Sequence, residues 1–148
     1  MRKWDARAVI FKWMDGVLYL LVVTSRSTDK RFIHRPPQVK FPGGTNTDHT
    51  EDGGPPHTSC REGSEETGFL MKKPKFLCKL PPTAKQLERW YYLCAVEDCE
   101  GALHEEEITD GPDVLWAHWE RADRLKYVLF WTHRPVIREI VRHFGLVG

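Results

Sequence analysis

The sequence has little net charge and no long apolar segment. Its 22 lysines and arginines against 21 aspartates and glutamates give a formal net charge of +1 at pH 7. Because positive and negative charges nearly cancel, electrostatics gives no argument for nucleic acid or a membrane surface as the dominant partner. The longest apolar run, 17–23, is far too short to span a bilayer. Residues 1–5 are basic without an apolar stretch behind them, so we expect no signal peptide.

Paired cysteines and metal-binding histidine patterns are also missing. The four cysteines, at positions 60, 78, 94 and 99, form no Cys-x-x-Cys pair and no zinc-like spacing with the seven histidines. Reduced thiols in a cytoplasm are the simplest explanation, so we expect a cytoplasmic protein. No histidine shows a ligand pattern, and we expect each to be structural or exposed, including His49, His57, His118 and His133.

The remaining composition is that of an ordinary globular protein. Apolar residues make up 41% of the chain and charged residues 29%. A chain of 148 residues is large enough to bury a sizeable core. We expect one domain covering residues 1–148, without internal repeats.

Apolar patterning predicts a sheet between helices. Strands are expected at 7–13 and 17–23, separated by the hairpin signal Asp15-Gly16. The run 17–23 is continuously apolar, which indicates a strand that is covered on both faces. Further expected elements are strands at 39–41, 75–80, 90–96 and 114–119, a polar loop at 98–113, a turn or short helix at 121–125 and a helix with a clear apolar stripe at 135–144.

The segment Arg61-Glu62-Gly63-Ser64-Glu65-Glu66-Thr67-Gly68-Phe69 is the most informative stretch of the chain. As a helix it sets Glu62, Glu65 and Glu66 at i, i+3 and i+4 on one face, where like charges repel one another. Mg²⁺ or Mn²⁺ would reverse that repulsion, because both ions favour carboxylate oxygens. Arg61 can hold the cluster, and Gly68 suits a left-handed helix cap.

This helix, expected at 55–67, has almost no hydrophobic stripe. The face opposite the glutamates carries the small or compact residues Pro56, Cys60, Gly63 and Thr67. We therefore expect the helix to lie close against the sheet, under large side chains from the strands.

Together with the upstream turn Phe41-Pro42-Gly43-Gly44, the acidic segment resembles the signature of the Nudix hydrolase family. That signature reads Gly, five residues, Glu, seven residues, then Arg-Glu-U-x-Glu-Glu-x-Gly-U, where U is a bulky apolar residue. The matching positions are Arg61, Glu62, Glu65, Glu66, Gly68 and Phe69. The resemblance implies an α/β fold, a Nudix-type α/β/α sandwich with a mixed sheet between helices.

The first half of the signature is degraded. Gly53 stands where the signature has its upstream glutamate, and Gly63 stands at the first bulky apolar position. The loop that follows Gly44 is three residues longer than usual and contains Asp48, Glu51 and Asp52.

The resemblance implies a Mg²⁺- or Mn²⁺-dependent hydrolase that cleaves a diphosphate linkage in a nucleoside diphosphate derivative or a related compound. Its metal ligands would be Glu62, Glu65, Glu66 and the backbone carbonyl of Gly44, with Arg61 orienting the cluster. Many family members take their base from a loop just before a late, tryptophan-rich strand. That loop here contains Glu105, Glu106 and Glu107, and we choose Glu106, although no spacing separates it from its neighbours.

The basic stretch 24–38 has two interpretations. It is either a solvated connection or a phosphate-facing rim, because arginine forks match phosphate oxygens. For the second case we name Arg26, Arg35 and Lys40 as substrate-binding residues. The partner would be a small nucleotide-like diphosphate compound; a membrane is not expected and nucleic acid is disfavoured, while a homodimer stays open.

Two other functions compete with hydrolysis. A Nudix-fold sensor or scaffold would bind a nucleotide-like ligand without turnover, and the missing glutamate at Gly53 favours it. An isomerase of isoprenoid diphosphates is the third reading, but that family is usually longer and relies on a cysteine and a glutamate that this chain does not obviously present.

Overall fold

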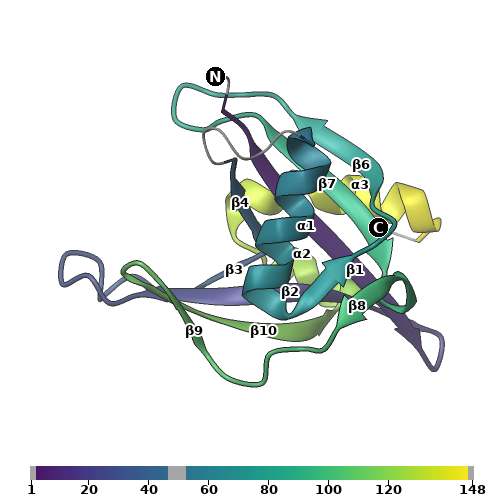
Figure 1. Cartoon of the computed structure of the whole chain (residues 1–148), viewed down its shortest axis with the longest axis horizontal. Helices are drawn as coiled ribbons and strands as arrows, with labels where there is room; N and C mark the ends of the chain where they lie inside the picture. Colours follow the sequence, from purple (N-terminus) through teal and green to yellow (C-terminus); the bar gives the residue numbers. More distant parts are fainter. Residues whose placement is uncertain (1–2, 47–52, 147–148) are drawn as a thin grey trace.

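A mixed β-sheet between helices forms the framework of this protein (Figure 1). The computed structural model describes residues 3–46 and 53–146. The main sheet has the strand order β6–β7–β1–β2–β10–β9, with β3 paired to β2 and β4 paired to β1. Its strands are β1 (Asp5–Met14), β2 (Val17–Ser27), β3 (Gln38–Lys40), β4 (Gly43–Thr45), β6 (Lys75–Leu80), β7 (Arg89–Ala95), β9 (Ile108–Asp110) and β10 (Asp113–Arg121). Strands β5 (Phe69–Met71) and β8 (Cys99–Gly101) form a separate antiparallel pair.

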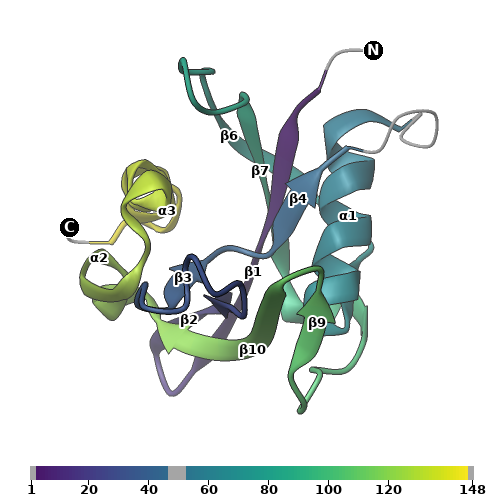
Figure 2. The same ribbon diagram turned by 90° about the vertical axis from the view of Figure 1, so that its left-hand side faces the viewer.

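Helices cover both faces of the main sheet (Figure 2). Helix α1 (Gly54–Thr67) lies on one face, and α2 (Leu125–Val128) and α3 (Pro135–Phe144) lie on the other. Alternate residues of β2 enter two separate cores. Leu20 and Val22 pack with side chains of α3, whereas Leu21 and Val23 pack on the α1 side. The continuous apolar run therefore belongs to a strand covered on both faces, as predicted.

The hairpin between β1 and β2 confirms the turn signal. Asp15 and Gly16 both have positive φ angles, 52° and 77°. The favoured two-residue hairpin turn requires that conformation at both positions. Strand β2 runs past the predicted end at residue 23 because β10 pairs with it as far as Ser27.

Strand β1 makes the sheet mixed. It pairs in parallel with β7, in a register from Asp5↔Arg89 to Phe11↔Ala95, while its ladders with β2 and β4 are antiparallel. The sandwich architecture and its mixed sheet are thus confirmed, and the helix predicted at 135–144 has those bounds.

The predicted polar loop at 98–113 is wrong in part. It contains β8, which pairs with β5, and β9, which pairs with β10. Strands of three residues are too short to show an alternating pattern, so sequence periodicity could not reveal them. The segment 43–45, expected to be only a turn, is the short strand β4. The acidic residues Asp48, Glu51 and Asp52 and also His49 lie outside the described residues.

Helix α1 does lie close to the sheet, but not under large side chains. A Cβ atom added at Gly63 would lie 3.1 Å from the Cβ atom of Ala8 on β1, so two small residues meet at this contact. Thr67 at the end of the same face is fully buried. The expectation of large strand side chains was wrong at Gly63, where the gap accommodates only an alanine, whereas Cys60 on the same face packs against the core that contains Tyr92. Close packing also explains why Gly63 replaces a bulky apolar residue.

Two further observations concern thiols and membrane insertion. All four cysteines are free thiols, and Cys94 Sγ lies 3.9 Å from Cys99 Sγ. Among residues 3–46 and 53–146, no helix combines the length and apolar character needed to cross a bilayer.

The Gly63–Ala8 contact predicts a steric penalty for the residue type that the family signature has at this position. We expect Gly63→Leu to destabilise the protein by about 1–3 kcal/mol, because overpacking forces the helix from the sheet. Thermal unfolding measures the loss. The variant Ala8→Gly should destabilise the wild type yet recover part of the stability lost in Gly63→Leu, since the two side chains meet directly. An unchanged melting temperature for Gly63→Leu would contradict this packing.

Candidate functional site

Two adjacent glycines bring the backbone of β4 against helix α1. A Cβ atom at Gly43 would collide with the carbonyl oxygen of Ala6 on β1. A Cβ atom at Gly44 would lie 2.8 Å from the carboxyl carbon of Glu62. Glycine is required at position 43, where the neighbour is backbone, and at position 44 it lets the backbone lie directly beside a carboxylate of α1.

Glu66 is the most buried carboxylate of the acidic helix. Its side chain belongs to a residue that is only 7% exposed, and its Oε1 accepts a hydrogen bond of 3.2 Å from the backbone N–H of Gly43. Burial raises the pKa of Glu66 to about 7; Arg7 and the Gly43 N–H oppose that rise, whereas the charges of Glu62 and Asp110 add to it. A carboxylate held this way is costly to ionise without a nearby cation.

Glu62 and Glu65 have different surroundings. The side chain of Glu62 is 17% exposed, and burial is the main cause that raises its pKa, against the opposing charge of Arg61. The side chain of Glu65 is 59% exposed. Arg61 Nη1 lies 3.1 Å from Glu62 Oε1 and 3.3 Å from Glu65 Oε1. Arg61 thus contacts both carboxylates, and its contact with Glu65 is the one that the i, i+4 spacing indicated.

The three helix glutamates do not form a closed cage. Glu62 and Glu66 lie at the glycine pair, while Glu65 extends toward solvent beside Arg61. Within the described part of the chain, no group of three or more His, Cys, Asp or Glu residues is gathered closely enough to hold a metal ion.

Sequence reasoning missed the ion pair on β1 that lies next to this acidic group. Arg7 Nε and Nη2 donate to the two carboxylate oxygens of Asp5, at 2.7 and 2.8 Å, and Arg7 Nη1 donates to the Phe41 carbonyl oxygen at 3.0 Å. The charge of Arg7 reaches Glu66. The signal was available, because residues two apart on a strand share a face and can pair.

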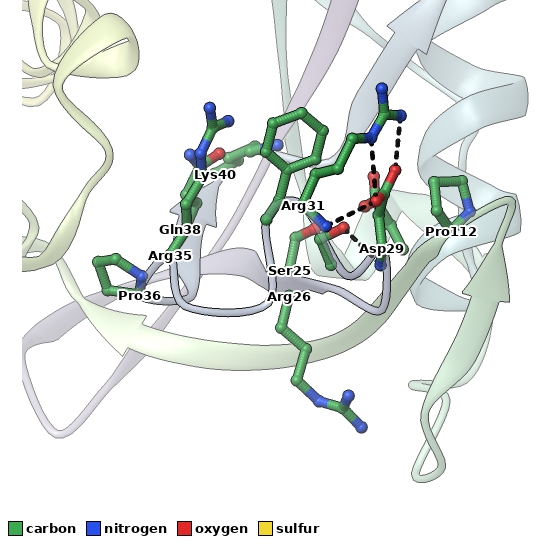
Figure 3. A pocket seen from close by; sticks show the side chains of 12 residues that line it. Ser25, Arg26, Asp29, Arg31, Arg35, Pro36, Gln38, Lys40 and Pro112 are labelled. Atoms are coloured by element: carbon green, nitrogen blue, oxygen red, sulfur yellow. Dashed lines mark hydrogen bonds and ion pairs between the residues drawn. The ribbon is translucent and has the colours of Figure 1, made fainter.

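The basic loop forms a cavity of about 360 Å³ beside this site (Figure 3). Arg35 stacks on Phe32, with its guanidinium carbon 4.1 Å from the ring centroid, and Lys40 contributes to the same wall. Arg31 pairs with Asp29 at 2.8 Å. Arg26 also lines the cavity, but its guanidinium extends away from Arg35 and Lys40 in Figure 3 and reaches Glu107 at 3.4 Å. The structure therefore brings Arg35 and Lys40 together and separates Arg26 from them.

The predicted base lies on an exposed segment. Glu105, Glu106 and Glu107 are all exposed in the stretch that precedes β9. Glu107 makes the ion pair with Arg26 just described, and the role of Glu106 stays a prediction. Asp110, at the end of β9, is the carboxylate of this region whose charge reaches both Glu62 and Glu66. Sequence reasoning missed it because its strand is only three residues long.

Comparisons with known proteins identify the fold. No protein-family model and no curated protein sequence matches the chain. Among solved structures, a MutT Nudix hydrolase from Burkholderia pseudomallei is similar with a TM-score of 0.67 and 19% sequence identity, over 95% of this chain and 98% of that one. The Nudix domain of Shewanella oneidensis NrtR, solved with ADP ribose, is similar with a TM-score of 0.64 and 19% identity, over 97% of this chain and 89% of that one.

A third similar structure is described as an ADP compounds hydrolase, with a TM-score of 0.63 and 15% identity, over 99% of this chain and 77% of that one. Structural similarity at sequence identities of 15% to 19% is evidence for the fold alone. Nearly the whole chain is covered in each comparison, and the glycine turn and acidic helix lie within the described part of that fold. The chain has the fold of the Nudix hydrolases.

Proposed function

We propose that this protein is a Mg²⁺- or Mn²⁺-dependent hydrolase that cleaves a diphosphate linkage in a nucleoside diphosphate derivative or a related compound. The observation that carries the proposal is the placement of Glu62 and buried Glu66 directly against the Gly43–Gly44 backbone. Similar structures include a MutT Nudix hydrolase and an ADP compounds hydrolase, which supports this reaction class.

The charges at the site fit a divalent cation. Glu66 and Glu62 repel each other across a poorly solvated space, and Asp110 adds a third negative charge. Arg7, whose positive charge favours the ionised form of Glu66, already has both carboxylate oxygens of Asp5 as partners. Glu62, Glu66, the Gly44 carbonyl and Glu65 would supply the oxygen ligands that Mg²⁺ and Mn²⁺ prefer.

When bound, the ion would withdraw charge from a diphosphate and acidify a water molecule. The chain's own residues set up the rest of the chemistry. Gly44 lets its backbone lie beside the Glu62 carboxylate, and Arg61 holds Glu62 and Glu65 in position. A separate carboxylate is needed to remove a proton from the attacking water, because a cation depresses the basicity of its own ligands. Glu106 and Asp110 are the two candidates.

The neighbouring cavity suits the organic part of the substrate. The ring of Phe32 and the Arg35 guanidinium stacked on it provide an aromatic and cationic surface. Such a surface binds planar groups by stacking and phosphate oxygens by charge. The ADP ribose bound to the similar Shewanella domain has both kinds of group, which supports a nucleotide-like substrate here.

A binding protein without turnover is the second candidate. Gly53, in place of the signature glutamate, has no side-chain oxygen to offer, and it lies immediately before α1. A further similar structure, full-length Shewanella oneidensis NrtR, was solved with a 27mer DNA, although this chain covers only 61% of it. Turnover in Mg²⁺ separates the two candidates.

Loss of either helix carboxylate should abolish most metal-dependent turnover. We expect Glu65→Gln and Glu66→Gln each to lower the rate of phosphate release from diphosphate compounds by roughly 10²-fold, since ligand loss should cost at least as much as loss of a group that orients a ligand. Mg²⁺ should also raise the melting temperature of the wild type more than that of either variant. Near wild-type rates in both variants would exclude the proposed site.

The buried carboxylate of Glu66 should make the stability of the metal-free protein depend on pH. The folded-state pKa of Glu66, about 7, exceeds its ordinary value of 4.5, so its contribution to stability is present in acid and is lost as pH rises through 7. Ionising Glu66 in the folded protein therefore lowers the free energy of unfolding by on the order of 3 kcal/mol. In EDTA, Glu66→Gln should therefore gain melting temperature over the wild type between pH 5 and pH 8. The exposed Glu65→Gln serves as the control and should show a much smaller gain.

The base should be revealed by a matched pair of variants. If Glu106 is the base, Glu106→Gln should lower turnover by about 10²-fold while the Mg²⁺-induced rise in melting temperature is kept. Asp110→Asn provides the comparison, because the charge of Asp110 reaches both site glutamates. A large loss in Asp110→Asn with a normal rate in Glu106→Gln would move the role to Asp110. Normal rates in both would place the base elsewhere.

A further inference from the structure

A second cavity, of about 230 Å³, shares Lys40 with the cavity of the basic loop. Its walls come from segments that are far apart in the sequence. Asp5 and Arg7 of β1 and Arg89 of β7 lie on neighbouring parallel strands, where Asp5 and Arg89 are in register. Lys40, and Phe130 and His133 from the segment before α3, complete the lining.

The cavity holds three cationic side chains and one carboxylate. Asp5 neutralises Arg7 through two hydrogen bonds of 2.7 and 2.8 Å, and the third Arg7 donor is taken by the Phe41 carbonyl. Arg89 and Lys40 are left without a carboxylate partner among residues 3–46 and 53–146. Arg89 donates only to the Tyr91 hydroxyl, at 3.4 Å, and the Lys40 ammonium makes no hydrogen bond there.

A chain of hydrogen bonds orients the histidine in this cavity. His133 is 3% exposed, and burial together with Arg7, Arg89 and Lys40 lowers its pKa to about 2, so the imidazole is neutral. Tyr91 Oη lies 3.0 Å from His133 Nδ1 and accepts from Arg89. In the tautomer that carries its proton on Nε2, His133 accepts the Tyr91 hydroxyl proton at Nδ1 and keeps an N–H donor on Nε2. In that tautomer the neutral His133 is a donor beside Arg89 and Lys40.

These positive charges disfavour one another within the cavity. The pKa of Lys40 is lowered, first by burial and then by the charge of Arg7, against the opposing charges of Asp113, Glu66 and Asp5. An oxyanion would reverse both effects, because it would replace lost hydration and oppose the like charges. The two unpaired cations match the two negative charges of a phosphate monoester better than the single charge of a carboxylate. Donors from three different segments also suit a tetrahedral group.

We propose that this cavity binds a phosphate monoester through Arg89, Lys40 and His133. Lys40 lines both cavities, and Arg7 has electrostatic contact with Glu66, so the subsite adjoins the region assigned to the diphosphate. Resting on the proposed function, the inference extends to specificity: the preferred substrate carries a further phosphate group beyond the diphosphate that is cleaved. Binding of phosphate itself does not depend on catalysis.

The cavity is tested first with inorganic phosphate. The whole chain is titrated calorimetrically in EDTA, with ionic strength held constant by KCl. Arg89→Gln should weaken phosphate binding about tenfold or more, because it removes a charge-assisted donor. Arg31→Gln is the matched control, since it removes a guanidinium from the neighbouring cavity, and it should leave the affinity unchanged. Arg89→Lys, which keeps the charge, should retain part of the affinity and shows that loss in Arg89→Gln is not loss of folding.

Three results would overturn the assignment. They are absence of phosphate binding by the wild type, an affinity that depends on Arg31 and not on Arg89, and equally tight binding of acetate, which would remove the preference for phosphate. Melting curves without ligand confirm that each variant is folded.

The specificity arm uses turnover. Diphosphate substrates with and without an additional phosphate monoester are compared, and the ratio of their kcat/KM values should fall about tenfold in Arg89→Gln but not in Arg142→Gln, which removes an exposed guanidinium of α3. An unchanged ratio despite lost phosphate binding would refute the link to the substrate. If no diphosphate compound is hydrolysed at all, the proposed function fails, whereas the phosphate titration still decides the cavity.

Discussion

The close contact between helix α1 and the backbone of β1 and β4 is the constraint on which the candidate site depends. Three glycines permit it: Gly63 faces Ala8, Gly43 faces the Ala6 carbonyl, and Gly44 faces Glu62. Larger residues at these positions would hold the helix farther from the strands and leave its carboxylates more exposed. Here the short distance buries Glu66 and lets the Gly43 N–H reach it.

The buried carboxylates of α1 and the cationic side chains around Arg89 occupy separate, neighbouring regions. The Asp5–Arg7 pair lies between the glutamates on the α1 side of the sheet and the cationic cavity around Arg89. Because Asp5 already neutralises Arg7, neither the acidic group nor the cationic cavity gains a full counter-charge from that pair. The chain's net charge of +1 conceals this separation of opposite charges into neighbouring regions.

Sequence patterns identified those parts of the fold that local chemistry determines. The hairpin at Asp15-Gly16, the doubly covered strand β2 and helix α3 follow from turn conformation and apolar periodicity over several residues. The helix glutamates followed from their i, i+3 and i+4 spacing. Three-residue strands such as β8 and β9 carry too little pattern to be recognised.

The parts that could not be predicted depend on contacts between distant segments. His133, for which the sequence showed no ligand pattern, meets Tyr91 and the cationic cavity only because β7 and the segment before α3 fold together. Asp110 approaches the helix glutamates in the same way. Spacing within one segment carries no information about such meetings. The small partner of Gly63, Ala8, could not be predicted for a related reason, because the register of β1 decides which of its residues faces the helix.

The parallel pairing of β1 with β7 has a consequence for how the molecule assembles. As the chain leaves the ribosome, β1 finds β2 at once through a two-residue turn, but Asp5 must wait for Arg89 and Phe11 for Ala95. Pairings of such sequence separation close late and slow folding. We therefore expect a nascent chain that ends before β7 to expose one whole edge of its first strand. That edge, with unpaired backbone N–H and C=O groups, is the segment of the growing chain most open to pairing with a second copy.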